Sequence, residues 1–166
     1  MKTFFHINYI RFASNFFSIV IKIVYKITFF VRTVRTKNNN LIEFHTDTAS
    51  SKVLDLKKNP HAGIHIWLPK VQLQIQMDVV IEIKVGDTII PIWKNVPTNS
   101  RIAYGTIPNP GSVIKSPFAY DHAPDHKRFA VLICHIESIQ LLLLGVKHIR
   151  ANYKKTNNWK GEWLSP

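Results

Sequence analysis

The sequence predicts a mainly β domain, a small β-barrel with a few helices packed on it. Short segments in which polar and apolar residues alternate recur along the chain, and turn residues separate them. Only one or two segments have the apolar spacing that is typical of a helix. The length of 166 residues favours one domain, and 46% hydrophobic against 19% charged residues is the balance of a chain that folds.

Residues 1–30 are the least regular part of the chain. Residues 16–31, FFSIVIKIVYKITFFV, are strongly apolar, but Lys22 and Lys26 interrupt them. A membrane-spanning helix needs roughly 20 residues with few or no charges, and no signal-peptide cleavage site follows, so we expect no membrane partner. The β-branched content favours strands, with residues 25–31 as the first barrel strand, while polar residues at four-residue spacing leave a helix as the alternative.

The central part of the chain shows a hairpin followed by a helix. We expect strands at 31–37 and 41–46, joined by a turn of three asparagines, because asparagine tolerates left-handed turn conformations. In the segment FHTDTASSKVLDLKKNP, residues 44–60, a polar loop is followed by apolar residues at helical spacing, and Asn59-Pro60 ends the helix.

The remaining elements follow from the same patterns. They are strands at 63–68 and 71–84 around a Pro69-Lys70 turn, a short helix or turn at 88–96, a proline-rich loop at 105–128, a pair of strands at 128–135 and 137–144, and a closing strand at 147–153.

The start of the expected helix is a candidate anion site. Ser50, Ser51 and Lys52 stand where a helix offers unpaired N–H groups and the positive end of its dipole. The alternative is a capped surface helix with a solvated lysine, and the local spacing alone favours that alternative.

Composition bounds the compartment and the partners. The single cysteine, Cys134, lies within the apolar run FAVLIC, so internal disulfides and zinc ribbons are excluded, and we expect a reducing, cytoplasmic location. The net charge is +12, and residues 1–70 carry eleven Lys and Arg against three acids. A basic nucleic-acid-binding or membrane-surface-binding protein is therefore an alternative, but no exposed aromatics interleave with the basic residues, and we expect no nucleic-acid partner.

Six motifs stand in a characteristic order: RTVRTK at 32–37, FHTDTASSK at 44–52, NP, LQIQ at 73–76, WKNVPTNSR at 93–101 and HIRANY at 148–153. In this order the chain resembles the FMN-binding split-barrel family typified by pyridoxamine 5′-phosphate oxidase. The resemblance covers residues 31–166 and leaves residues 1–30 as a diverged N-terminal segment of helix or strand. It implies a split β-barrel of the FMN-binding type, FMN as the cofactor, a homodimer, and FMN-dependent oxidoreductase activity on a small-molecule substrate.

The resemblance also implies which residues contact the cofactor. Matching the family's motifs gives the flavin-binding set Arg32, Lys37, Thr46, Ser51, Lys52, Gln74 and Arg150. Cations and N–H donors suit a phosphate with nearly two negative charges, and a glutamine amide both donates to and accepts from the polar edge of a flavin.

The substrate positions match only in part. Tyr104, Ser112 and His148 match family residues that contact the substrate, whereas Pro108 and Val146 stand where the oxidase has arginines. Without those cations a substrate phosphate lacks charge partners, which argues against pyridoxamine 5′-phosphate oxidase activity itself. A non-catalytic flavin-binding relative is the alternative, and no catalytic residue is assigned.

Two departures touch the flavin site, because Gln76 and Asp78 replace the arginine and the glycine that the family carries there. The histidine pairs His61/His65 and His122/His126 have no evident third ligand, so we expect no metal site.

Overall fold

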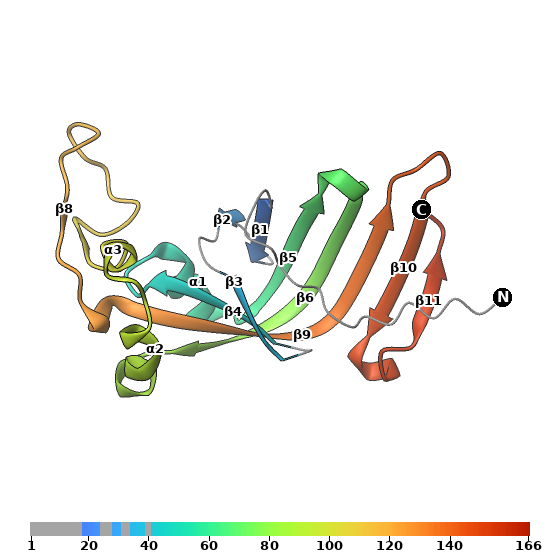
Figure 1. The fold of residues 1–166 in the computed structure, drawn as a ribbon, viewed down its shortest axis with the longest axis horizontal. Coiled ribbons are helices and arrows are strands. Elements are labelled where there is room, and N and C mark those ends of the chain that lie inside the picture. Colours follow the sequence, from blue (N-terminus) through green and yellow to red (C-terminus); the bar gives the residue numbers. More distant parts are fainter. Residues whose placement is uncertain (1–17, 24–27, 31–33, 39–40) are drawn as a thin grey trace.

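The computed structural model describes residues 18–23, 28–30, 34–38 and 41–166 (Figure 1). Its main element is a nine-stranded sheet in which all paired neighbours are antiparallel. The strands are β1 (Ser18–Ile23), β2 (Thr28–Phe30), β3 (Val34–Asn38), β4 (Leu41–Asp47), β5 (His61–Leu68), β6 (Leu73–Lys84), β9 (Phe129–Leu143), β10 (Ile149–Lys154) and β11 (Gly161–Leu164).

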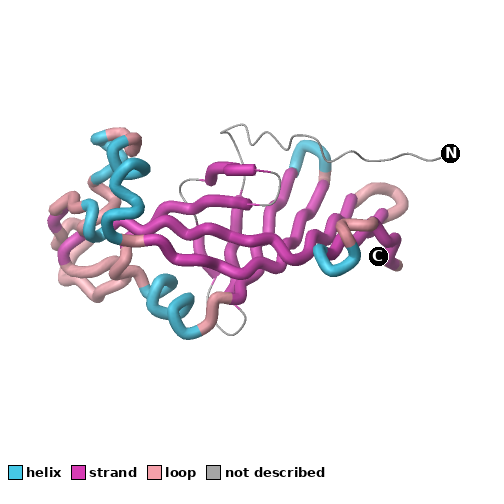
Figure 2. The backbone as a smooth tube through the Cα atoms, turned by 90° about the horizontal axis from the view of Figure 1, so that it is seen from below, coloured by secondary structure: helices cyan, strands magenta, loops and turns pink. Residues whose placement is uncertain are grey.

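The helices lie at one end of the sheet, and short 3₁₀ segments connect strands at both ends (Figure 2). The helices are α1 (Ser51–Lys58), α2 (Ile90–Lys94) and α3 (Thr98–Arg101), and the 3₁₀ segments are η1 (Pro69–Val71), η2 (Gly86–Ile89), η3 (His126–Arg128) and η4 (Lys155–Asn157). A separate two-stranded ribbon consists of β7 (Thr106–Ile107) and β8 (Asp121–His122).

The long strand β9 is the branch point of the sheet. Its first half pairs with β4 on one side, its second half pairs with β10 on that same side, and β6 follows it along the other side. The β4 branch continues into β3, while β6 continues through β5 and β1 to β2. The sheet therefore divides at β9, which is the architecture of a split barrel, and the predicted mainly β fold with a few packed helices is confirmed.

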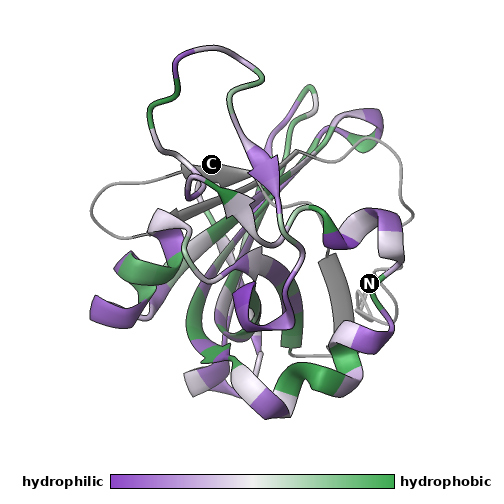
Figure 3. Cartoon of the chain, turned by 90° about the vertical axis from the view of Figure 1, so that its left-hand side faces the viewer, coloured by the Kyte–Doolittle hydropathy of each residue, from purple (hydrophilic) through white to green (hydrophobic). Residues whose placement is uncertain are grey.

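Two hydrophobic clusters lie on opposite faces of this sheet. The larger cluster fills the barrel, with Phe44, Ile64 and Ile75 each 1% exposed. The smaller cluster lies outside the barrel, where α2 and η2 pack over β9 around the fully buried Phe129 and Ile89. Figure 3 views the molecule from this end and shows polar and apolar residues mixed along the helices, as expected for helices with one face on the sheet.

Several expected elements are confirmed. The hairpin of β3 and β4, the helix α1, the strands β5 and β6 with η1 between them, and the short helix α2 all occur where the sequence places them. The three-asparagine turn falls partly outside the described residues, as do residues 31–33 of the first hairpin strand.

Two expectations at the C-terminal end were wrong. Residues 128–135 and 137–144 do not form a pair of strands, because β9 runs through both segments. Asp78 pairs with Ser138 and Val79 with Ile136, so Glu137 is an extra residue in the ladder, a β-bulge that the chain passes without turning. The strand at 147–153, observed as β10, is also not the closing strand, since β11 pairs along its outer edge.

The N-terminal strand expected at 25–31 is also corrected. Within it the structure describes only β2, at Thr28–Phe30, and residues 24–27 and 31 lie outside the described residues. The strand that pairs with β5 is the earlier β1, in which Lys22 pairs with Gly63. The ladder is made by backbone groups, so a lysine within the run does not prevent it. No helix among the described residues is long and apolar enough to span a membrane.

The buried thiol of Cys134 gives a test of the barrel core. Burial raises the pKa of Cys134 from 9.0 to about 12. Only the thiolate attacks thiol reagents, so the folded protein should react very slowly at about pH 8, and unfolding in urea should release one rapidly reacting thiol. Because the folded pKa is the higher one, the stability linked to this group is present below pH 9.0 and is lost as the pH rises towards 12. Equal reaction rates in the folded and unfolded protein would contradict this packing.

Candidate functional site: a cavity at the start of helix α1

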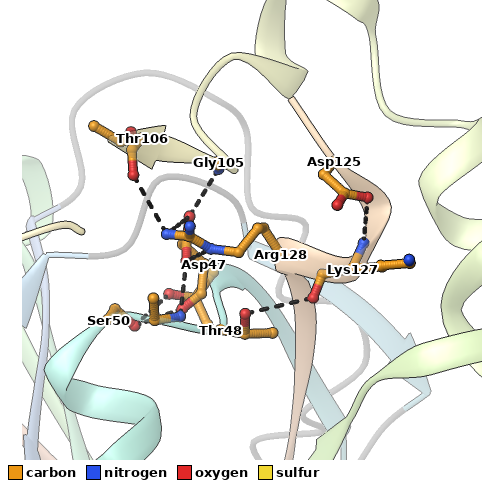
Figure 4. A network of polar contacts seen from close by, with 10 residues as sticks. Asp47, Thr48, Ser50, Gly105, Thr106, Asp125, Lys127 and Arg128 are labelled. Atoms are coloured by element: carbon orange, nitrogen blue, oxygen red, sulfur yellow. Dashed lines mark hydrogen bonds and ion pairs between the residues drawn. The ribbon is translucent and has the colours of Figure 1, made fainter. Parts of the chain in front are cut away.

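The carboxylate of Asp47 organises the end of the molecule that carries the cavity (Figure 4). Its side chain is 4% exposed and accepts the N–H groups of Ala49 and Gly105, each at 2.8 Å. The guanidinium of Arg128 donates to the same carboxylate, from Nε at 3.0 Å and from Nη2 at 3.2 Å. One buried carboxylate thus joins the end of β4, the loop after α3 and the start of β9.

Further hydrogen bonds fix the turn around Arg128. The N–H of Thr48 donates to the Arg128 carbonyl at 2.8 Å, and Arg128 Nη2 reaches the Thr106 carbonyl at 3.4 Å. The carboxylate of Asp125 accepts the N–H of Lys127 at 2.9 Å. The loop at 105–128 is therefore held at its base by specific contacts, although the segment 111–120 at its far end is exposed.

A cavity of about 380 Å³ opens where these elements meet. Its lining comes from β4 and the start of α1 on one side, and from the segment after α3 and the β7–β8 ribbon on the other. The lining residues are His45, Thr46, Asp47, Ser50, Lys52, Ala103, Tyr104, Thr106, Pro110, Tyr120 and His122.

Two hydroxyls and an ammonium group converge at the start of α1. Lys52 Nζ donates to Thr46 Oγ1 at 3.3 Å, and Thr46 Oγ1 lies 3.3 Å from Ser50 Oγ. Ser50 is the N-cap residue, but its hydroxyl donates to the Asp47 carbonyl at 2.7 Å and makes no cap hydrogen bond with the N–H groups of the first turn. A cation, hydroxyls and helix N–H groups facing a cavity are the donor set that an anion requires.

A buried histidine–carboxylate pair stands beside these groups. His45 Nε2 lies 2.8 Å from Glu43 Oε1, and the two side chains are 2% and 7% exposed. The edge of the imidazole also packs on Phe129, with ring centroids 4.9 Å apart. His45 is thereby fixed in the wall of the cavity by one charged and one aromatic neighbour.

Comparison with known proteins shows which fold surrounds this cavity. No protein-family model and no curated protein sequence matches the chain. Among solved structures, a pyridoxamine 5′-phosphate oxidase-related, FMN-binding protein from Nostoc punctiforme superposes with a TM-score of 0.71 at 22% identity, over 90% of this chain and 87% of that chain. The chain has the fold of the pyridoxamine 5′-phosphate oxidase-related, FMN-binding proteins.

Two other solved structures have the same split-barrel fold. PhzG from Burkholderia lata, in complex with tetrahydrophenazine-1-carboxylic acid, has a TM-score of 0.71 at 12% identity, over 90% of this chain and 81% of that one. A Clostridium acetobutylicum protein related to general stress protein 26, of the pyridoxinephosphate oxidase family, has a TM-score of 0.54 at 13% identity, over 85% and 86% of the two chains.

Within this split barrel, part of the expected flavin set lies together. Thr46, Lys52 and the substrate candidate Tyr104 line the same cavity. Ser51 is the exposed first residue of α1, and its neighbour Ser50 is the serine in the cavity wall. Arg32 lies outside the described residues. Lys37 belongs to β3, which forms a hairpin with β4, and the structure describes only the backbone of Lys37.

The other two expected flavin residues form a second group on the sheet. Gln74 on β6 and Arg150 on β10 both pair with Leu142 of β9. The two residues therefore lie on either side of Leu142, on the same face of the sheet. Arg150 Nη2 donates to Gln140 Oε1 at 2.7 Å, while its Nε is buried and has no hydrogen-bond partner among the residues that the structure describes. A buried N–H of a cation without an acceptor is costly, and a bound polar ligand would relieve that cost.

The two groups are far apart within one chain. Thr46 pairs with Ala130 of β9, whereas Gln74 and Arg150 pair with Leu142. Twelve residues of extended strand separate these two positions on β9, which corresponds to about 40 Å along the strand. In Figure 1 the start of α1 and the strand β10 accordingly lie on opposite sides of the molecule.

The remaining substrate candidates do not line the cavity. Ser112 is exposed in the far part of the 105–128 loop, and its N–H donates to the Asn109 carbonyl at 3.0 Å. His148 is exposed in the turn between β9 and β10, with its Nδ1 3.2 Å from the Gly145 carbonyl. Pro108 and Val146, which replace the family's arginines, are both exposed as well.

Sequence reasoning missed the residues that build the far wall of the cavity and its anchor. Asp47 stands within the motif FHTD, but its partners Gly105 and Arg128 are 58 and 81 residues further along the chain, so no local spacing indicates the contact. Tyr120 and His122 lie in a loop without periodicity, and only the proline-rich composition marked that loop as a long connection.

Substituting Asp47 tests whether this carboxylate holds the cavity together. In Asp47→Asn the guanidinium of Arg128 loses its charge partner and an amide group faces two N–H donors, so we expect a loss of about 2–4 kcal/mol in unfolding free energy. Urea unfolding followed by tryptophan fluorescence measures this loss. The control is Asp125→Asn at a carboxylate that is 45% exposed, where asparagine caps as well as aspartate and stability should change little. Equal stability of the two variants would show that Asp47 is not the anchor.

Proposed function

We propose that this protein is a flavoprotein that binds FMN and catalyses an FMN-dependent oxidation or reduction of a small molecule. The observation that carries the proposal is the convergence of Lys52, Thr46 and Ser50 on a cavity at the uncapped start of α1. The Nostoc punctiforme protein of the same fold is an FMN-binding protein, which supports the choice of this cofactor.

The residues present suit the cofactor at both of its polar ends. The phosphate of FMN carries nearly two negative charges, and Lys52, Thr46 and the first N–H groups of α1 supply a cation and hydrogen-bond donors for it, with Arg32, Lys37 and Ser51 proposed as further contacts. Gln74 and the buried Nε of Arg150, which has no partner within the described part of the chain, supply donors for the polar edge of the ring system. When bound, FMN supplies the electron or hydride transfer, and the protein supplies position and electrostatics.

The distance between the two groups of residues makes the proposed site a two-chain site. A separation of about 40 Å along β9 is much longer than one flavin nucleotide, so a single chain cannot hold both ends of the same cofactor. A symmetric pair of chains can place the α1 start of one copy against the Gln74–Arg150 face of the other. We therefore propose a homodimer with two equivalent FMN sites.

The surface beside Arg150 is suited to contact with a second copy. Exposed apolar side chains gather on β9, β10, β11 and the intervening turn: Leu143, Val146, Ile149, Trp163 and Leu164. Leu164 pairs directly with Arg150, and Trp163 is 71% exposed. Large exposed apolar groups next to half of a binding site are typical of a surface that a partner covers.

The substrate is proposed to differ from that of pyridoxamine 5′-phosphate oxidase. Pro108 and Val146 carry no charge for a substrate phosphate, and Ser112 lies away from the cavity. Tyr104 is the family substrate residue in the cavity wall of the same chain. We propose a cytoplasmic location because the lone Cys134 is a reduced, buried thiol.

Flavin binding by the purified protein tests the cofactor. The protein should be yellow or should take up added FMN, and Lys52→Ala should weaken the affinity for FMN at least about tenfold because it removes a charged phosphate contact. Fluorescence quenching of FMN measures the dissociation constant. Lys57→Ala is the matched control, since Lys57 is exposed in the last turn of the same helix. A wild-type protein without affinity for FMN would sink the proposal and favour a salt-sensitive binder of nucleic acid or membrane surfaces.

Subunit mixing tests whether the site spans two chains. Lys52→Ala and Arg150→Ala chains should each bind FMN weakly when purified alone. In a heterodimer of the two, one site joins the intact Lys52 of one copy to the intact Arg150 of the other, so co-expression should restore about one quarter of the wild-type sites. Titration with FMN counts them, and light scattering reports the dimer. If mixing restores no FMN binding, Lys52 of one chain and Arg150 of the other do not belong to one shared site.

A further inference from the structure

The β7–β8 ribbon is a rigid part of the cavity wall that the proposed cofactor contacts do not use. Thr106 pairs with His122 and Ile107 with Asp121. The Ala123 N–H donates to the Gly105 carbonyl at 2.9 Å, and the Asp125 N–H donates to the Tyr104 carbonyl at 3.3 Å. The ribbon is thus tied at its base to the segment that the Asp47 carboxylate holds.

Gly105 makes this tie possible. Its φ is +114°, a conformation that residues with a side chain rarely adopt, and a Cβ at this position would overlap the carbonyl of Ala123. The two limbs of the loop therefore approach closely at their base, and the position of the ribbon follows from the packing of the backbone.

One face of the ribbon points into the cavity. Directly paired residues share a face, so Thr106 and His122 lie on one side of the ribbon, and Tyr120 directly precedes β8. All three line the cavity, whereas Ile107 and Asp121 on the other side do not. The rings of Tyr120 and His122 meet edge to face, with centroids 5.1 Å apart.

The opposite wall of the cavity has a different chemistry. There the start of α1 presents Lys52 and the hydroxyls of Thr46 and Ser50, which suit an anion, and the proposed function assigns these groups to the cofactor phosphate. The ribbon instead presents a phenol ring and an imidazole, with Pro110 and Ala103 as apolar neighbours. Such a wall favours a flat ring with polar substituents, since aromatic rings pack on each other and imidazole nitrogens donate or accept hydrogen bonds.

We infer that Tyr120 and His122 are the specificity-determining residues that contact the molecule reacting with the flavin, and that they select a planar aromatic ring. This inference rests on the proposed FMN site. Tyr120 is 40% exposed at the cavity mouth, so its ring is available to a ligand that enters from solvent. The close backbone contact between Gly105 and Ala123 holds the side chains of Tyr120 and His122 in place before that ligand binds, which lowers the entropic cost of binding.

A matched pair of small amides tests the inference on the FMN-loaded protein. Benzamide and cyclohexanecarboxamide differ in the aromaticity of the ring, and perturbation of the flavin absorbance reports the binding of each without turnover. We expect benzamide to bind the wild type about 3- to 10-fold more tightly, which is the range of an aromatic contact. Tyr120→Leu should remove this preference, and His122→Ala should weaken benzamide binding.

The control variant is Phe118→Leu, which changes an aromatic residue of the same loop that is 86% exposed and outside the cavity lining. It should leave both amide affinities unchanged, and all three variants should bind FMN within about twofold of the wild type. A wild type with no preference for benzamide, or a Tyr120→Leu variant that keeps it, overturns the inference. Loss of FMN affinity in Tyr120→Leu also overturns it, because Tyr120 would then be a cofactor contact. A wild type that never binds FMN is a different result, the failure of the proposed function.

Discussion

The buried carboxylate of Asp47 is the constraint on which the cavity depends. It accepts two backbone N–H groups and two N–H groups of Arg128, and its donors come from the turn between β4 and α1, from the segment after α3 and from η3, which leads into β9. A carboxylate 4% exposed is tolerable only because these donors replace the water it has lost. As a consequence, the wall built by β4 and α1 and the wall built by the β7–β8 ribbon keep a fixed relation to each other.

The branching of the sheet at β9 has an equally direct consequence for function. Because β4 and β10 share one side of β9, at opposite ends of a single strand, the α1 cavity and the Gln74–Arg150 face cannot meet within one chain. The bulge at Glu137 lies between these two ends, where the pairing on that side passes from one branch to the other. This separation along β9 is the physical reason why the FMN site that we propose is shared between two chains.

The candidate site could be predicted from the sequence only where the chemistry is local. Within FHTDTASSK the polar loop and the helical spacing indicated Ser50, Ser51 and Lys52, and family resemblance added Thr46. The structure shows the contact between Lys52 Nζ and Thr46 Oγ1. Tyr104 was predicted as a substrate residue from the family resemblance alone. In the structure its ring packs on Phe129 and Trp93, which fixes its position in the cavity wall. The ribbon residues Tyr120 and His122 had no such signal, because a loop's conformation depends on the contacts that hold its base.

By itself, the sequence determined the mainly β class, most strands and helices from β3 to β10 and the buried position of Cys134. These follow from residue periodicity, turn chemistry and capping, which act over a few residues. Tertiary structure decided that β9 is one strand with a bulge, that β11 adds an outer edge, that Asp47 pairs with Arg128 and that Thr46 and Lys52 lie far from Gln74 and Arg150. Each of these depends on residues brought together across tens of positions, and local propensity carries no information about such pairings.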